Sequence, residues 1–288
     1  MGSREDELKN LVSQALAASA NDDWPAAAAA YEQVLQIAPD HPLSEQWWFN
    51  AALAYKFLRN WQKAFELGKQ AAARSKPGEG DPAFWNLGIA ATILREWQVA
   101  RDAWRDYGIE IEPGDGPIDQ GFGTACVRIN TPSGEEVVWA ERLCPARARV
   151  INVPFHTSRR FGEVVVHDGT PNGERVSGER QVPVFDELVL FEPSPLVTLA
   201  TEIRSASAED TSALLDAFYD GGYGAEVKTG RVICRSCDEG SVVQAPHEHE
   251  TGPTTLLIAA PEPEALEILD RWRAGGPDAR DWTDLGVA

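Results

Sequence analysis

The chain has 288 residues, of which 43% are hydrophobic and 10 are tryptophan, so it can bury the cores of two or three globular domains. Its formal net charge of −19 makes nucleic acid and anionic membrane surfaces poor partners and favours a basic protein instead. No apolar run approaches the roughly 18 residues that a membrane-spanning helix needs, and residues 1–10 lack the apolar centre of a secretory signal.

Three tryptophans, Trp24, Trp61 and Trp97, recur 37 and 36 residues apart, and each precedes a helix rich in small residues. The apolar pattern is helical from residue 8 to about residue 113. A helical hairpin of this size cannot bury its own apolar face, so successive copies must stack, and stacking creates an extended surface for another protein. The repeat therefore favours a protein-binding function over a catalytic one.

Other positions repeat together with the tryptophans. Small residues follow three positions later (Ala27, Ala64 and Ala100), and prolines close the units (Pro39, Pro77 and Pro113). Trp48-x-x-Ala51-Ala52-x-x-Tyr55 and Trp85-Asn86-Leu87-Gly88 place aromatic and then small residues on one face of a first helix. On these residues, about the first 110 positions resemble the tetratricopeptide repeat, with periods longer than its usual ~34 residues.

The resemblance implies antiparallel helix pairs stacked into a right-handed arc whose concave side binds peptides or protein surfaces. Trp47, Phe49 and Trp85 lie beside the framework positions, and we predict that they are exposed anchors for a partner. The tryptophans that begin the second helices are expected to be packing residues. The alternative is a helical unit that only supports the rest of the chain.

A loop rich in glycine and aspartate at residues 113–117 marks the end of the helical region. Beyond it, short segments rich in β-branched and aromatic residues predict a small antiparallel β barrel or sandwich. The predicted strands are 122–129, 136–143, 147–153, 162–167 and 182–191. A second composition break falls at residues 192–195, so the predicted domains are 1–114, 118–193 and 194–288.

The last domain is predicted to be a ferredoxin-like α+β domain, because strand, helix and strand occur twice with a hairpin between them. The predicted order is strand 196–204, helix 208–219, strands 227–234 and 254–259, helix 263–274 and a final strand at 282–287. Ser207 is predicted to cap the first of these helices, and Gly221-Gly222 to end it.

The four cysteines include a C-x-x-C sequence at 234–237, followed by His247-Glu248-His249. Two thiolates in such a turn and two histidines on one side of an extended segment suit tetrahedral zinc. We predict a structural zinc ion held by Cys234, Cys237, His247 and His249. The alternatives are two reduced thiols in a turn, a redox pair, a solvated acidic loop at the His-Glu-His-Glu tract, or a catalytic zinc with a neighbouring glutamate. The cysteines are too few and too clustered to form a disulfide scaffold, which favours a reducing compartment. We therefore expect the protein to be cytoplasmic.

Signals for catalysis are otherwise thin. Cys126 and Cys144 lie in apolar strands and are expected in the core. Five arginines between residues 142 and 160 form either a cationic patch or a solvated barrel face. No hydrolase, metalloprotease or phosphate-loop sequence is present.

The sequence thus predicts a non-enzymatic intracellular interaction protein. The more specific prediction is a bacterial immunity or adaptor protein that binds and blocks a basic effector or toxin, because strong acidity speeds the capture of a cationic target. The alternatives are a zinc-dependent enzyme with a repeat arm for recruitment, and an assembly chaperone or scaffold.

Overall fold

The computed structural model describes residues 2–177, 180–228 and 254–288. The chain divides into two compact units, the first comprising residues 1–120 with 144–146, and the second comprising residues 121–143 with 147–288. The second unit contains both β-rich parts, so the predicted three-domain division stays a prediction. No helix within the described ranges is long and apolar enough to cross a bilayer.

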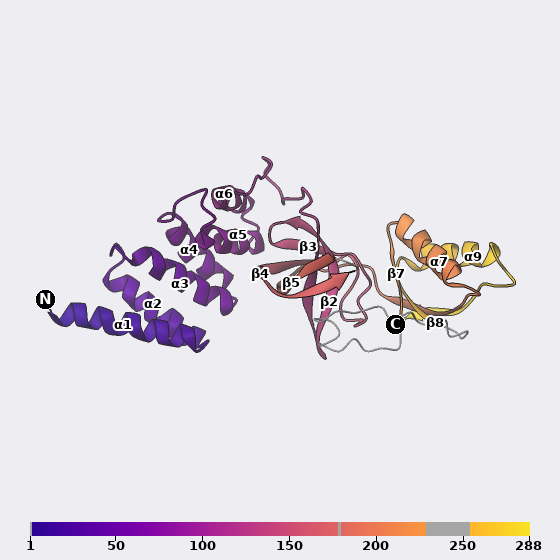
Figure 1. Cartoon of the computed structure of the whole chain (residues 1–288), viewed down its shortest axis with the longest axis horizontal. Helices are drawn as coiled ribbons and strands as arrows, with labels where there is room; N and C mark the ends of the chain where they lie inside the picture. The colour runs from indigo at the N-terminus through magenta and orange to yellow at the C-terminus, as the bar shows by residue number, and fades with distance from the viewer. Residues whose placement is uncertain (1, 178–179, 229–253) are drawn as a thin grey trace. The chain divides into compact units, whose positions relative to one another are not determined.

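In the described part of the first unit, six helices pack in antiparallel succession, each against the next in the chain (Figure 1). They are α1 (Gly2–Ala20), α2 (Trp24–Ile37), α3 (Ser44–Phe57), α4 (Trp61–Ala72), α5 (Pro82–Ile93) and α6 (Trp97–Tyr107). Each of the three repeated tryptophans is the first residue of the second helix of a pair. The predicted helix pairs of the tetratricopeptide type are confirmed.

The turns inside the three pairs share one backbone conformation. Asp22, Arg59 and Arg95 have φ angles of 56°, 55° and 62°, in the left-handed region that favours glycine. The residue after each donates its N–H to a carbonyl in the last turn of the preceding helix, at 2.9, 2.9 and 2.8 Å. The conformation recurs at the same spacing as the tryptophans, so the tight turn is part of the repeat.

The chain after α6 remains attached to the helical unit. Arg101 is only 5% exposed and donates to the carbonyls of Glu112 (3.2 Å) and Gly116 (2.5 Å). Ile111 and Ile118 are buried on either side of this anchor. The segment predicted as an interdomain loop therefore closes the end of the helical stack, and the first compact unit extends to Gln120.

Five of the described strands form a closed barrel in the order β1-β2-β3-β4-β5. They are β1 (Thr124–Thr131), β2 (Gly134–Cys144), β3 (Arg147–Val150), β4 (Val164–Ser177) and β5 (Arg180–Glu192). The barrel closes through a parallel pair between β1 and β5, which differs from the predicted antiparallel barrel or sandwich. The reason is geometric: in a meander of five strands, the first and the last run in the same direction.

One buried ionic cluster lies at the barrel. Arg159 donates to Glu163 and, through two nitrogens, to Glu187, with each of the three bonds at 2.8 Å. All three side chains are less than a tenth exposed, and Arg147 is also buried. Two of the five arginines, Arg147 and Arg159, are therefore buried, whereas Arg149 is exposed, so the arginine-rich stretch is not a continuous cationic patch.

The remaining described strands form a four-stranded antiparallel sheet in the order β7-β8-β6-β9. Its elements are β6 (Leu199–Arg204), α7 (Ala208–Asp220), β7 (Gly224–Val227), β8 (Thr254–Ala259), α9 (Glu262–Ala274) and β9 (Asp281–Val287). This is the strand order of two interleaved βαβ units. Ser207 caps α7 by accepting from the N–H of Asp210, and α7 ends at Gly221, as predicted.

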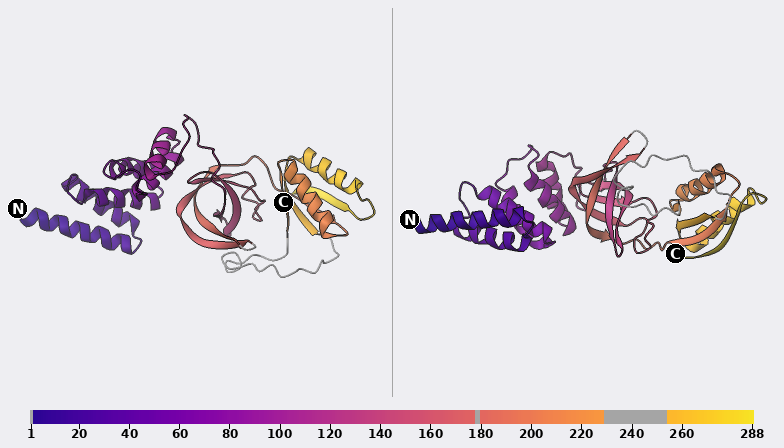
Figure 2. Two further views of the ribbon diagram at one scale, coloured as in Figure 1. Left: turned by 45° about the horizontal axis from the view of Figure 1, so that its top comes forward. Right: turned by 60° about the horizontal axis from the view of Figure 1, so that its bottom comes forward.

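Both helices cover the same face of this sheet (Figure 2). Leu214 and Phe218 of α7 and Leu269 of α9 pack with Leu256 and Ile258 of β8 in one buried cluster. Other side chains of β8 point to the opposite face, as the alternation along a strand requires. There Leu257 and Ala259 are buried against Val153, Phe155 and Phe161.

Candidate functional site

The helical unit carries its candidate binding surface on the first helices of the pairs, α1, α3 and α5. α3 packs against α5 as well as against its own partner α4. α1 and α3 contribute to one buried cluster, which includes Ala15 and Ala51. We define the A-helix face by Leu16, Phe49, Leu53, Lys56 and Asn86. Phe49, Leu53 and Lys56 are four and three residues apart on α3 and therefore share one side of it.

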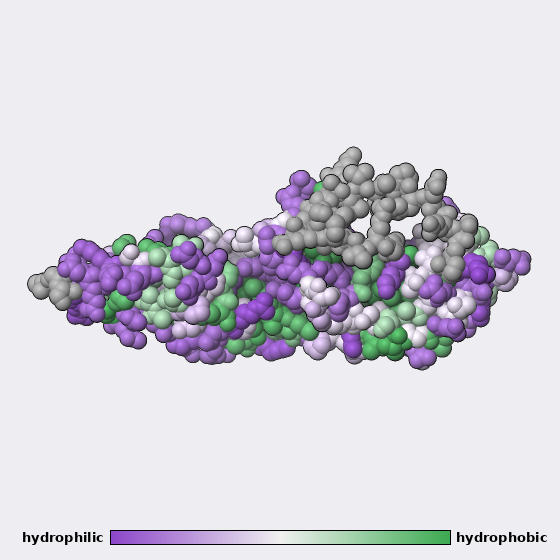
Figure 3. All heavy atoms as spheres, turned by 90° about the horizontal axis from the view of Figure 1, so that it is seen from below, coloured by the Kyte–Doolittle hydropathy of each residue, from purple (hydrophilic) through white to green (hydrophobic). Residues whose placement is uncertain are grey.

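The other two residues of this face follow from the repeat. Leu16 on α1 lies 37 residues before Leu53, and Asn86 on α5 lies 37 residues after Phe49. Leu16 is 53% exposed, whereas Phe49 and Leu53 are half-buried. The A-helix face thus presents apolar side chains from two helices to solvent. The space-filling view shows hydrophobic patches among hydrophilic residues on the surface of the helical unit (Figure 3).

A polar contact holds two helices of the face in register. The buried Lys56 donates from Nζ to Oδ1 of Asn86, at 3.2 Å, which joins α3 to α5. Burying an ammonium group without a partner is costly, so this bond favours one arrangement of the two helices. The face is therefore a preformed surface.

The second helices are joined by an ion pair. Lys63 of α4 lies 2.8 Å from Glu32 of α2, and the hydrogen bond from Lys63 lowers the pKa of Glu32. Tyr55 is beside this pair, and burial raises the pKa of its hydroxyl. The neutral tyrosine and the charged pair both persist at neutral pH, so the joint between the first and second repeats does not change its charge there.

The predicted anchors have three different environments. Trp47 is only 5% exposed and stacks on His41 with ring centroids 4.7 Å apart, so the prediction that it is an exposed anchor is wrong. Trp85 is half-buried and meets Trp104 and Tyr107 edge-on, at 5.1 and 4.9 Å. Phe49 is half-buried and lies on the A-helix face, where its proposed role in partner binding stays a prediction.

Leu16 and Leu53 were not predicted as binding residues. The signal that identifies them was present in the sequence, since they occupy the same position of consecutive repeats. It was missed because leucine at a helical spacing is most often a core residue. Only the exposure of Leu16 in the structure distinguishes a surface residue available for binding from a core residue.

The four predicted zinc ligands, Cys234, Cys237, His247 and His249, lie outside the described residues. Within the described ranges, no group of three or more His, Cys, Asp or Glu side chains is placed to hold a metal ion. Cys126 and Cys144 are fully buried, as expected for core cysteines.

Comparisons with known proteins found similarity among solved structures. No protein-family model matches the chain, and no curated protein matches it. Among solved structures, the chain is similar to the Sgt2 TPR domain from Aspergillus fumigatus, with 27% sequence identity and a TM-score of 0.30. The similarity covers 35% of this chain and 64% of that chain, which is less than two thirds of its length. The tetratricopeptide character of the N-terminal region rests on its own helix pairs and repeated positions.

Proposed function

We propose that this protein is a non-enzymatic protein-binding protein that holds a partner on the A-helix face. The observation that carries the proposal is the exposure of Leu16 in the same repeat position as Leu53, beside Phe49. Apolar side chains presented by a preformed helical surface are the kind of contact that dominates protein interfaces. The polar link between Lys56 and Asn86 sets the spacing of the helices that a partner meets.

We further propose that the partner is basic. Residues 1–120 contain 18 Asp and Glu against 11 Lys and Arg, so the helical unit contributes to the net charge of −19. A field of this sign speeds the association of a cationic protein and repels an acidic one. An immunity or adaptor protein that blocks a basic effector or toxin suits this charge. An assembly chaperone that receives a basic tail is the second candidate with the same surface.

Affinity capture with matched variants tests this proposal. The full-length protein, its Leu16→Glu variant and its Leu43→Glu variant are used as baits in extracts of the cells that produce it. Leu43 is the matched control, since it is also 53% exposed but lies in the turn before α3. We expect a basic protein to be recovered with the unaltered bait and with Leu43→Glu, and to be lost with Leu16→Glu.

Two results would contradict the proposal. Equal recovery with all three baits would show that the A-helix face does not bind the partner. Recovery of an acidic partner would contradict the proposal that the charge of the protein selects a basic one. Raising the salt concentration in the same experiment should lower the recovery of the basic partner, because charge attraction between exposed groups is screened over about 8–10 Å at physiological salt and over shorter distances above it.

We also propose that Cys234, Cys237, His247 and His249 bind a structural zinc ion. The support is the sequence pattern alone, a C-x-x-C turn and two histidines one residue apart. Zinc measured by elemental analysis should be equimolar with the protein, and Cys234→Ser should release it and lower the melting temperature. Absence of zinc after purification without chelators would contradict this proposal. If Cys234→Ser abolished a zinc-dependent enzymatic activity and left the protein folded, the zinc would be catalytic and the protein an enzyme.

A further inference from the structure

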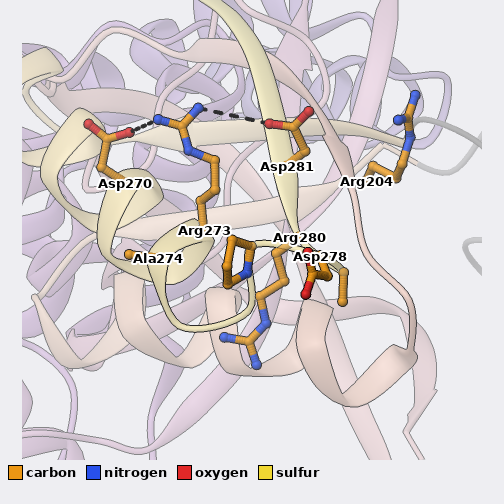
Figure 4. Close-up of a pocket in the computed structure, with 9 residues that line it drawn as sticks. Arg204, Asp270, Arg273, Ala274, Asp278, Arg280 and Asp281 are labelled. Carbon is orange, nitrogen blue, oxygen red and sulfur yellow. Dashed lines mark hydrogen bonds and ion pairs between the residues drawn. The ribbon is translucent and has the colours of Figure 1, made fainter.

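The sheet-and-helix part of the second unit contains a surface depression of about 480 Å³ (Figure 4). It is lined by three arginines and three aspartates from the end of β6, the last turns of α9 and the segment leading into β9. These residues are Arg204, Arg273 and Arg280, with Asp270, Asp278 and Asp281. The volume falls within the range of small-molecule sites, about 300–1,000 Å³.

Two of the arginines are already neutralised inside the protein. Arg273 lies between Asp270 and Asp281, with nitrogen–oxygen distances of 2.6 and 3.8 Å (Figure 4). Arg280 donates to Asp210 from Nε (2.8 Å) and Nη2 (2.6 Å), and from Nη1 to the carbonyl of Trp272 (3.2 Å). These bonds build the walls of the depression and leave few donors for a ligand.

Arg204 and Asp278 are different. Within the described part of the chain, neither the Arg204 guanidinium nor the Asp278 carboxylate has an ion pair or a hydrogen bond. Asp281 is the cross-strand neighbour of Arg204 but pairs with Arg273 instead. The head of Arg204 stands apart from the group around Arg273 (Figure 4). Both side chains are exposed. As far as the structure describes the chain, the depression therefore offers one cation and one anion without a partner inside the protein.

We propose that the depression binds a small zwitterion, with its carboxylate on Arg204 and its ammonium group on Asp278. The lining charges balance, so the site has no net attraction for a ligand of one sign. The net charge of −19 adds repulsion against simple anions. A ligand that carries both charges avoids this repulsion and satisfies both uncommitted groups. An arginine presents a fixed fork of donors to a carboxylate, which favours that end of the ligand.

Calorimetric titration of the full-length protein tests this inference with four probes. Glycine and 4-aminobutyrate are a short and a long zwitterion, while propionate and propylamine carry only one charge each. We expect a zwitterion to bind more tightly than both single-charge probes. Arg204→Gln and Asp278→Asn should each weaken that binding about tenfold, the loss expected for one charged hydrogen bond. Arg271→Gln is the control, because Arg271 is exposed on α9, pairs with Glu267 and does not line the depression.

Three outcomes would overturn the inference. Propionate binding as tightly as the zwitterion would indicate a plain anion site, and propylamine doing so would indicate a cation site. No binding by any probe, or binding that Arg204→Gln leaves unchanged, would remove the site. Because the depression lies in the second unit, these outcomes are independent of the variants at Leu16 and Leu43.

Discussion

The packing of α5 against α6 can be tested with one methyl group. A Cβ atom added to Gly88 would lie 2.6 Å from two ring carbons of Trp104, a side chain that is completely buried. In contrast, a Cβ atom added to Gly68 in α4 would meet Leu87 at 3.6 Å, an ordinary contact. Both glycines lie inside a helix, so Gly88→Ala and Gly68→Ala form a matched pair.

The magnitudes follow from two opposing effects. Replacing glycine by alanine inside a helix stabilises it by about 1 kcal/mol, and this gain is common to both variants. Forcing a methyl group into a packed core costs about 1–3 kcal/mol, and this penalty applies only at Gly88. We therefore expect Gly68→Ala to stabilise the helical unit by up to about 1 kcal/mol. Gly88→Ala should be about 1–3 kcal/mol less stable than Gly68→Ala.

Urea unfolding followed by far-UV circular dichroism measures the difference, because six of the described helices, α1 to α6, lie in the first unit and only α7 and α9 in the second. The comparison between the two variants is more informative than either value alone, because the helix-propensity gain cancels. If Gly88→Ala were as stable as Gly68→Ala, the close approach of the Gly88 backbone to Trp104 would be wrong. The packing proposed for the third repeat would then be wrong with it.

Four further variants test other features by the same unfolding measurement. Arg59→Gly should stabilise the helical unit by about 0.5–1 kcal/mol, because glycine removes left-handed strain at the turn but loses more freedom on folding; a loss of stability would contradict the repeated turn conformation. Arg159→Met should destabilise the barrel by about 3–5 kcal/mol, since it strands two buried glutamates. Arg149→Met at an exposed position should change stability by less than about 0.5 kcal/mol, and equal effects would refute the buried cluster. Burial lowers the pKa of His167 to about 4, below its unfolded value of about 6.5. The contribution of this group to the stability of the folded state is complete above pH ~6.5 and falls by up to about 3 kcal/mol as the pH decreases to about 4. His167→Gln should lack this part of the acid sensitivity, and parallel pH profiles for the two proteins would show that the histidine is solvated.

The sequence was sufficient to predict the helix pairs because their signal is local and repeated. A tryptophan, a small residue three positions later and a closing proline recur in each unit, and every copy adds to the same inference. The left-handed turns could not be predicted, because Asp22, Arg59 and Arg95 are not glycine, the residue that usually indicates this conformation. Their conformation is imposed by hydrogen bonds to the preceding helix, which only the structure shows.

Exposure was harder to predict than secondary structure. Trp47 belongs to the buried cluster that α1, α2 and α3 share, and His41, which precedes α3, stacks on it; periodicity within the helix carries no information about these contacts. The burial of Arg159 has a similar origin, since Arg159 lies between β3 and β4 whereas its partner Glu187 lies on β5. The closure of the barrel by a parallel pair also depends on the number of strands rather than on any one of them.

Site-specific photo-crosslinking in the full-length protein tests the central claim most directly. A photoreactive phenylalanine analogue replaces Leu16 in one protein and Leu43 in another, and covalent adducts are identified after irradiation in the cells that produce the protein. The A-helix face predicts an adduct with a basic protein from position 16 and little from position 43. Equal adducts from both positions, or none from position 16, would contradict the claim that this face holds a partner.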